Sequence, residues 1–144
     1  MANAKDVMMR VVTGFHRAVF QVSNGRVANR GYGMPVLQLT TTGRKSGKRR
    51  TTMLTSPVQD GDRMVVVASN GGDDRQPKWL LNLRDDPKVE VTMDGQTKAM
   101  RARVASPEEK VELWPRVIAA HRGYEQYQKR TDRDIPVVIC EPRS

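Results

Sequence analysis

Hydrophobic residues recur at intervals of three and four over the first 24 residues of the chain, which places them on one side of a helix. They are Met8, Val11, Val12, Phe15, Ala18, Val19 and Val22. We therefore predict an amphipathic helix over residues 1–24. Glycine and asparagine then become frequent, and residues 23–35 are predicted to form a loop.

From residue 36 onward, short apolar runs alternate with turn residues, a pattern that is typical of β-strands. Asp60-Gly61 and Asp94-Gly95 are two-residue hairpin signals. A short helix over residues 77–84 and a longer one from a Ser106 cap to about residue 121 interrupt the strands. The predicted strands cover residues 36–41, 50–58, 63–69, 88–93, 96–105 and 135–140.

This order of elements predicts a mainly β, α+β fold in which an antiparallel barrel carries peripheral helices, because closing a sheet removes its exposed edges. The length of 144 residues corresponds to a single domain. We assign the barrel to residues 36–142 and place the helix 1–24 before it. No apolar run approaches the roughly 20 residues of a membrane span, and no secretory signal is visible. A cytoplasmic location is therefore expected.

The chain has a net charge of +9, all of which lies in the first 59 residues, where ten Lys or Arg face one acid. Residues 43–50 (GRKSGKRR) hold five of these cations and two glycines. Such a turn suits an anion, because glycines let backbone amides approach an oxyanion and the cations add charge. It is not a nucleotide-binding P-loop, since Gly43 and Gly47 stand one residue too close. A solvated hairpin tip is the alternative.

Three other segments carry candidate chemistry, each with an ordinary structural alternative. Residues 69–72 (SNGG) follow a predicted buried strand, where the glycines either allow close approach of a flat ligand or simply form a turn. Asn82 shares a helix face with Trp79, so its amide needs a partner, either backbone or ligand. Tyr124 and Tyr127 either line a pocket or pack at the edge of the core.

The sequence contains no pattern that indicates a metal site or a catalytic nucleophile. The two histidines stand far apart in the sequence and offer no metal-ligand spacing, so no metal site is predicted. Cys140 lies in a predicted buried strand and is expected to be an inert core thiol. The adjacent acids Asp73-Asp74 and Asp85-Asp86 are expected to be solvated. The residues alone thus indicate a small barrel that binds an anionic, planar ligand.

Four stretches of the chain, in the correct order, resemble the deazaflavin-dependent nitroreductase family. They are LQLTTTGRKSGKRRTTML from Leu37, VVVASNGG from Val65, PKWLLNLRDDPKVEV from Pro77 and YEQYQKRTDRDIPVVICEP from Tyr124. The resemblance spans residues 36–142, whereas the N-terminal helix is only generically similar. These actinobacterial proteins belong to the flavin/deazaflavin oxidoreductase superfamily. The resemblance therefore implies a split β-barrel of the FMN-binding type.

The resemblance also implies a cofactor, coenzyme F420, which is a 5-deazaflavin with a phosphodiester and an oligoglutamate tail. The tail and phosphate would lie along the basic turn. The ring would lie between the second strand, the SNGG segment and the short helix. The implied cofactor-binding residues are Arg44, Lys45, Ser46, Arg50, Thr51, Thr52, Met53, Leu54, Thr55, Val67, Ala68, Ser69, Asn70, Lys78, Trp79, Leu80, Leu81, Asn82 and Tyr124.

The implied activity is F420H2-dependent hydride transfer to a small electron-poor acceptor, which is a quinone, an enone or other activated alkene, or a nitro compound. Ser69 and Tyr124 are the candidate catalytic residues, as hydrogen-bond donors to an acceptor oxygen. The substrate side is assigned to Thr55, His121, Tyr124 and Tyr127. Met53, Thr55 and His121 depart from the family pattern on that side, so we expect quinones and enones as electron acceptors equally with nitroimidazoles.

Three alternatives stay open at the level of sequence. An FMN-binding split barrel would also use a basic turn, although five cations exceed the need of one phosphate. Nucleic-acid binding fits the charge, but aromatic residues make up only 5% of the chain and none lies in the basic turn, so no nucleic-acid partner is expected. The helix 1–24 suits either peripheral contact with the inner face of the cell membrane or packing over the barrel. A monomer and a homodimer both fit the sequence.

Overall fold

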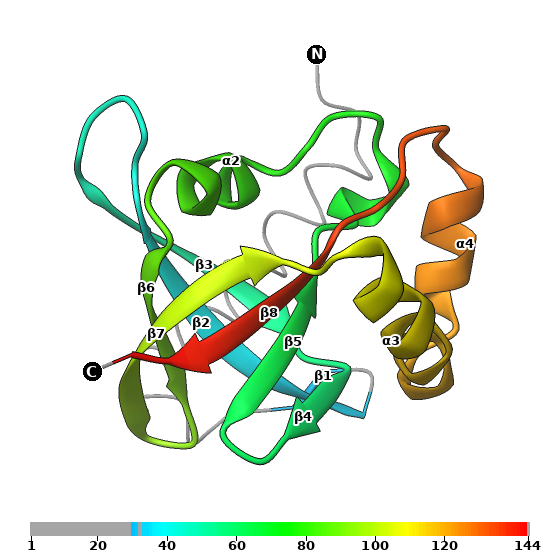
Figure 1. The fold of residues 1–144 in the computed structure, drawn as a ribbon, viewed down its shortest axis with the longest axis horizontal. Coiled ribbons are helices and arrows are strands. Elements are labelled where there is room, and N and C mark those ends of the chain that lie inside the picture. The colour runs from blue at the N-terminus through cyan, green and yellow to red at the C-terminus, as the bar shows by residue number, and fades with distance from the viewer. Residues whose placement is uncertain (1–29, 32, 144) are drawn as a thin grey trace, which may run out of the picture.

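The computed structural model describes residues 30–31 and 33–143. The helix predicted over residues 1–24 lies outside the described residues, as does most of the predicted loop 23–35. Within the described part, eight antiparallel strands form one sheet that curls into a barrel (Figure 1). The strands are β1 (Arg30–Gly31), β2 (Met34–Thr42), β3 (Arg49–Thr55), β4 (Val58–Asp60), β5 (Arg63–Val67), β6 (Lys88–Met93), β7 (Gln96–Val104) and β8 (Val137–Pro142).

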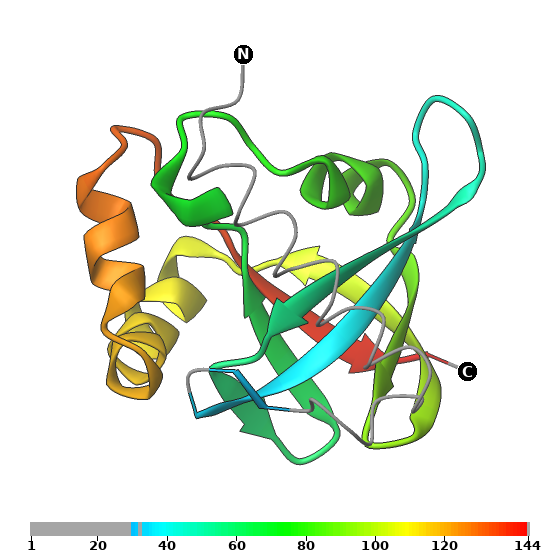
Figure 2. The same ribbon diagram turned by 180° about the vertical axis from the view of Figure 1, so that it is seen from behind.

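Helical segments lie around this barrel, namely the single turn η1 (Asn70–Gly72), α2 (Lys78–Asp85), α3 (Pro107–Ala120) and α4 (Gly123–Lys129). Helix α2 lies across one end of the barrel, beside the β2–β3 hairpin, whereas α3 and α4 pack together at its side (Figures 1 and 2). None of the described helices is long and apolar enough to cross a membrane.

Both predicted helices of the barrel region are confirmed. Ser106 caps α3, since its Oγ accepts a hydrogen bond from the backbone N–H of Glu109 at 3.2 Å and the Glu109 carboxylate accepts one from the Ser106 N–H at 2.9 Å. Helix α4 was not predicted, because its seven residues, GYEQYQK, contain no complete apolar period.

The strands follow the order β1-β2-β6-β7-β8-β5-β4, and β3 pairs with the other side of β2. Strand β2 is central, since Gln38 pairs with Met53 of β3 and with Thr92 of β6. In the described residues β3 pairs with β2 alone and β4 with β5 alone, so the barrel is split between β3 and β4. The predicted split β-barrel is confirmed.

The strand predicted over residues 50–58 is wrong as a single element, because the chain divides it into β3 and β4 at Ser56 and Pro57. Pro57 has no N–H to donate to a strand ladder. Ser56 is fully buried, and its hydroxyl donates to the carbonyl oxygen of Val65 at 2.7 Å. This inward hydrogen bond turns the chain at the end of β3 and opens the split.

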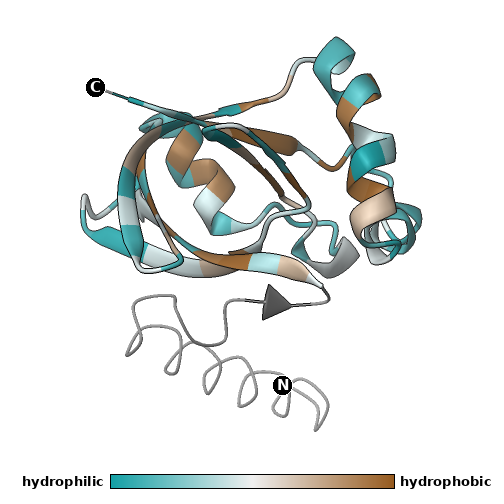
Figure 3. Ribbon diagram, turned by 90° about the horizontal axis from the view of Figure 1, so that it is seen from below, coloured by the Kyte–Doolittle hydropathy of each residue, from teal (hydrophilic) through white to brown (hydrophobic). Residues whose placement is uncertain are grey.

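The core has two layers, and β5 belongs to both. Because successive side chains of a strand point to opposite faces, Met64 and Val66 enter the barrel interior, whereas Val65 and Val67 face α3 and α4. Burial on both faces explains why β5 is the most apolar run of the chain. Helix α2 closes the interior layer with Leu80 and other apolar side chains, and Figure 3 shows it framed by the barrel strands.

Segment η1 packs tightly against α4 at Gly72. A Cβ at this position would lie 2.8 Å from the carbonyl oxygen of Tyr127 and 2.9 Å from the Cβ of Arg130. At Gly71 a Cβ would meet nothing within 4 Å. Both glycines have positive φ, 65° at Gly71 and 84° at Gly72. Close approach at Gly72 therefore serves the packing of α4 and not a flat ligand.

The two glycines give a matched pair of variants. Gly71→Ala is expected to lower the free energy of unfolding by about 1 kcal/mol, because a Cβ disfavours the left-handed backbone. Gly72→Ala adds a steric clash with α4 and is expected to lower it by about 2–4 kcal/mol. Urea denaturation of both variants measures the difference. Equal values would contradict the tight packing of η1 on α4.

Candidate functional site

A cavity of about 1160 Å³ opens between the β2–β3 hairpin, the end of β5 with η1, and the start of α2. It brings together most of the predicted cofactor-binding residues, although they come from three separate parts of the sequence. Those that line it are Arg44, Lys45, Ser46, Arg50, Thr51, Thr52, Met53, Leu54, Val67, Ser69, Asn70, Lys78, Trp79 and Asn82.

The lining of this cavity is strongly cationic. Among the described residues that line it there are five Lys or Arg side chains and no Asp or Glu; the cations are Arg44, Lys45, Arg50, Arg75 and Lys78. Arg75 binds Asp73 through its guanidinium at 2.8 Å, and this holds the pKa of the Asp73 carboxyl well below its ordinary value. The remaining lining is apolar or neutral, which suits a ligand that is part anion and part ring.

The basic turn between β2 and β3 is closed by its own backbone. The Gly43 N–H donates to the Lys48 carbonyl and the Gly47 N–H to the Gly43 carbonyl, both at 2.8 Å. Gly47 has a φ of 71°, which glycine adopts readily. A Cβ at Gly43 would lie 2.8 Å from Ser46 Oγ. The glycines thus make a tight loop that places its side chains beside the cavity.

Strand alternation at the start of β3 places Arg49 and Arg50 on opposite faces of the sheet. Arg50 lines the cavity, whereas the Arg49 guanidinium donates to Thr42 at 2.7 Å and to Glu90 of β6 at 2.9 Å. Lys48 does not line the cavity either. The charge argument treated the five cations as one group, whereas the residues implied by the resemblance included only Arg44, Lys45 and Arg50 of the five. In the structure these three line the cavity, and Arg75 and Lys78 complete the set.

Asn82 of α2 joins the basic turn to this helix by a hydrogen bond. Its Oδ1 accepts the backbone N–H of Arg44 at 3.1 Å, and its Nδ2 donates to Thr41 Oγ1 at 3.2 Å. Asn82 and Thr41 are both buried. The sequence left a backbone or a ligand as its partner, and the structure shows that Asn82 bonds protein groups while it also lines the cavity.

Five predicted cofactor-binding residues do not line the cavity, and their positions explain why. Ala68 and Leu80 are fully buried in the barrel interior, so we reassign their side chains from the cofactor site to the core. Leu81 lies off the helix face that carries Trp79 and Asn82. The last two, Thr55 and Tyr124, belong to a neighbouring cluster.

The residues predicted for the substrate side gather around Tyr124. Its hydroxyl lies 3.1 Å from Thr55 Oγ1, and its ring packs edge-to-face against His121 and Tyr127 with centroids 5.5 Å and 6.0 Å away. Burial raises the pKa of Tyr124, and the hydrogen bond with Thr55 partly offsets this. Thr55 directly follows Leu54, so this cluster adjoins the cavity lining without being part of it.

Sequence reasoning missed six residues of the lining: Thr41, Gly43, Gly71, Arg75, Gln76 and Pro77. Arg75 could have been found, because an arginine two residues after Asp73 pairs readily with it. The expectation of solvated acids holds for Asp74, which is exposed, and Asp73 is half-exposed, but both carboxylates also have protein partners. Asp73 binds Arg75, and Asp74 accepts a hydrogen bond from Thr131 at 2.7 Å.

A family model described as F420H(2)-dependent quinone reductase matches residues 10–142. An F420H(2)-dependent quinone reductase of Mycobacterium tuberculosis is 39% identical over 132 residues, which cover 89% of this chain and 88% of that protein. A solved structure described as an F420-H2 dependent reductase, FDR-A, is 38% identical with a TM-score of 0.68, covering 74% of this chain and 94% of its own. Another solved structure, described as a domain-swapped dimer, is 32% identical with a TM-score of 0.70, and the match covers 93% of this chain and 98% of that chain.

The Asn82 link can be tested without any ligand. Asn82→Ala removes the acceptor for the Arg44 N–H and the donor to buried Thr41, so the free energy of unfolding is expected to fall by about 1–3 kcal/mol. Amide hydrogen exchange at residues 43–48 is expected to accelerate.

Asn82→Asp is the matched variant, since a carboxylate still accepts the Arg44 N–H. It should keep exchange in the turn closer to that of the unaltered protein. Unchanged exchange in Asn82→Ala would show that the turn does not depend on this side chain.

Proposed function

The chain belongs to the F420H2-dependent quinone reductase family, and from this we propose that the cavity holds reduced coenzyme F420 for hydride transfer to a quinone or related acceptor. Its membership makes the chain an oxidoreductase with F420H2 as its cofactor. One observation supports the proposal for the cavity most strongly: five cations and no carboxylates among its described lining residues.

The donor groups present fit the chemistry of the coenzyme. Its phosphodiester and oligoglutamate tail form a polyanion, which Arg44, Lys45 and Arg50 would bind with Ser46 and Thr51 as neutral hydrogen-bond donors. The flat ring needs apolar contact with a few polar groups, as ligand sites commonly provide. The side chains that supply this are Thr52, Met53, Leu54, Val67, Ser69, Asn70, Lys78, Trp79 and Asn82.

When bound, the reduced deazaflavin supplies a hydride and thus carries the redox chemistry itself. The residues of the chain orient the two reactants and stabilise the charge that develops on the acceptor. Ser69 lies on the cavity wall, where its hydroxyl can donate to an acceptor oxygen. Tyr124 keeps its proton, because burial raises its pKa, so its phenol can also donate.

We place the acceptor against the cluster of Thr55, His121, Tyr124 and Tyr127. This cluster adjoins the cavity at Leu54, and its aromatic rings suit a planar quinone. Enones and nitro compounds are further acceptors of the same electron-poor class.

We also propose a cytoplasmic enzyme that works as a homodimer. The likeness to a solved structure described as a domain-swapped dimer supports the assembly. A quinone acceptor dissolves in lipid, so peripheral contact with the inner face of the membrane through residues 1–24 fits the same function. No nucleic acid takes part in it.

Arg50 and Arg49 offer neighbouring variants on opposite faces of β3. Arg50→Gln is expected to raise the Kd for F420 by about tenfold or more, because a charge-assisted hydrogen bond contributes about 1.5–3 kcal/mol. Arg49→Gln is expected to change it by less than about twofold, since the interactions lost are an exposed ion pair with Glu90 and an exposed hydrogen bond to Thr42, both away from the cavity. Quenching of tryptophan fluorescence measures both, because Trp79 lines the cavity.

Titration with FMN is the control for coenzyme identity. FMN carries a single phosphate and should bind more weakly, with a smaller effect of Arg50→Gln. Tighter binding of FMN, or equal effects of the two arginine variants on F420, would contradict the proposal.

Tyr124→Phe removes the phenol oxygen and keeps the ring. We expect turnover of a menaquinone analogue to fall by about 10²-fold or more, the range for a lost transition-state hydrogen bond, while the Kd for F420 holds. Steady-state kinetics and fluorescence titration separate the two quantities. If coenzyme binding falls instead, Tyr124 is a binding residue.

A further inference from the structure

The wall of the cavity formed by residues 68–76, called the rim segment below, has a strained backbone. Its residues Ser69, Asn70, Gly71, Arg75 and Gln76 line the cavity. Three consecutive positions have positive φ: 46° at Asn70, 65° at Gly71 and 84° at Gly72. Asparagine tolerates a left-handed backbone better than most residues do, and its surroundings still have to hold it there. Hydrogen bonds within the segment give part of this support, since the Asn70 amide donates to the Arg75 carbonyl and the Arg75 N–H donates to the Asp73 carboxylate. Groups outside the segment can fix its shape further.

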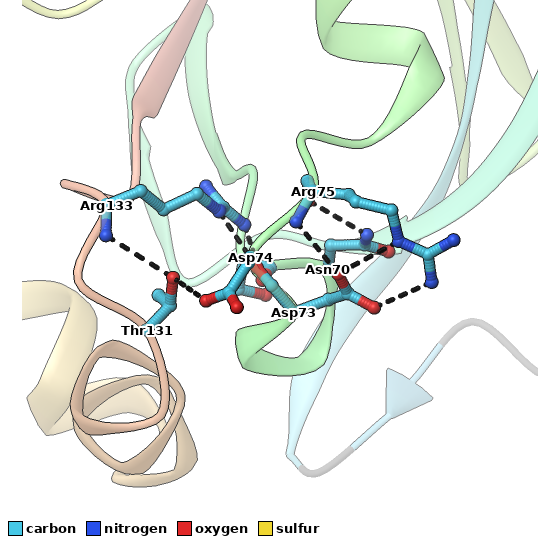
Figure 4. Close-up of polar contacts among 7 residues, drawn as sticks. Asn70, Asp73, Asp74, Arg75, Thr131 and Arg133 are labelled. Carbon is cyan, nitrogen blue, oxygen red and sulfur yellow. Dashed lines mark hydrogen bonds and ion pairs between the residues drawn. The ribbon is translucent and has the colours of Figure 1, made fainter.

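Arg133 is placed to do so, although it lies about sixty positions later in the chain (Figure 4). Its Nε donates to the Asp73 carbonyl at 2.9 Å, and its Nη2 donates to the carbonyls of Ala68 at 3.1 Å and Ser69 at 2.9 Å. Its Nη1 donates to the Gln76 side-chain oxygen at 3.0 Å. One guanidinium thus binds acceptors at both ends of the rim segment.

The backbone of Arg133 is itself anchored to α4. Gln128 Nε2 donates to the Arg133 carbonyl at 2.7 Å, and Gln128 Oε1 accepts the N–H of Ile135 at 3.0 Å. Thr131 accepts the Arg133 N–H at 3.3 Å and donates to Asp74 at 2.7 Å, as Figure 4 shows. The loop after α4 therefore holds the rim segment through several side chains, with Arg133 at the centre.

A guanidinium suits this position better than an ammonium does. Four neutral oxygens surround it in different directions, and arginine presents donors on three nitrogens in a rigid plane, whereas lysine offers one flexible ammonium. The charge of Arg133 also acts on the neighbouring Asp73 carboxyl, where it helps the Arg75 guanidinium to hold the pKa below its ordinary value.

We propose that Arg133 is a positioning residue for the coenzyme cavity. It touches no ligand and lines no part of the cavity. Its guanidinium holds the rim segment in the strained form that places Ser69 and Asn70 on the wall. The inference rests on the proposed function in so far as the ligand is F420.

Arg133→Ala and Arg133→Lys test the inference, with Arg143→Ala as the matched control. Arg143 also donates to backbone carbonyls, those of Met100 and Val89, but it lies away from the cavity. In the coenzyme-free protein, amide exchange over residues 69–76 is expected to rise at least about tenfold in Arg133→Ala, because the tie that resists local opening is lost. It should stay unchanged in Arg143→Ala.

Fluorescence titration then gives the Kd for F420. Arg133→Ala is expected to raise it at least about tenfold, Arg133→Lys by less, and Arg143→Ala by less than about twofold. If Arg133→Ala fails to fold, Arg133→Lys keeps the charge and carries the test. Native exchange and native affinity in both Arg133 variants would overturn the inference, as would an equal effect of Arg143→Ala.

The two proposals fail in different ways. If the unaltered protein does not bind F420, the proposed ligand is wrong, whereas the exchange experiment still reports whether Arg133 holds the rim segment. If the protein binds F420 and the Arg133 variants match it in affinity, only the role of Arg133 is wrong.

Discussion

The side-chain amide of Asn82 joins the two parts of the molecule on which the cavity depends. Helix α2 packs into the barrel interior through Leu80 and Leu83, and the basic turn connects β2 to β3 as a loop of like charges. Because these charges repel one another, a hydrogen bond from the turn to a packed element stabilises its position. Asn82 supplies it by accepting the Arg44 N–H while it bonds buried Thr41. Core packing of α2 therefore determines where the cations of the turn stand.

The opposite wall of the cavity is also held by hydrogen bonds between a side chain and loop backbone, in this case the side chain of Arg133. Residues 68–76 follow the buried strand β5 and include three left-handed positions. Arg133 donates hydrogen bonds to carbonyl oxygens of this segment, including those of Ala68 and Ser69. In both walls, one polar side chain from a neighbouring element satisfies backbone groups of a loop that has no strand partner. The loops carry the binding groups, and the packed elements behind them supply rigidity.

Short-range patterns in the sequence were enough for most elements, whereas most of the cavity lining was implied by the resemblance to the deazaflavin-dependent nitroreductase family. Apolar runs and turn residues located the strands, and the capping box located α3. Long-range contacts were not accessible in this way. The separation of Arg49 from Arg50 depends on which face of the sheet each side chain takes, and Arg49 reaches Glu90 of β6 across the intervening strand β2. The contact of Arg133 with Ala68 spans 65 positions. The break between β3 and β4 has a local signal in Pro57, which cannot donate to a strand ladder. The hydrogen bond from Ser56 to Val65 is not visible in the local sequence.

The central claim is that the basic turn binds the anionic tail of the coenzyme while the ring lies over the apolar wall. The most direct measurement is the affinity of the unaltered protein for F420 and for the same deazaflavin without its phosphate and glutamates, at low and at high salt. The account predicts that F420 binds far more tightly and that only its affinity falls as salt screens the cations. Equal affinities, or equal insensitivity to salt, would contradict it.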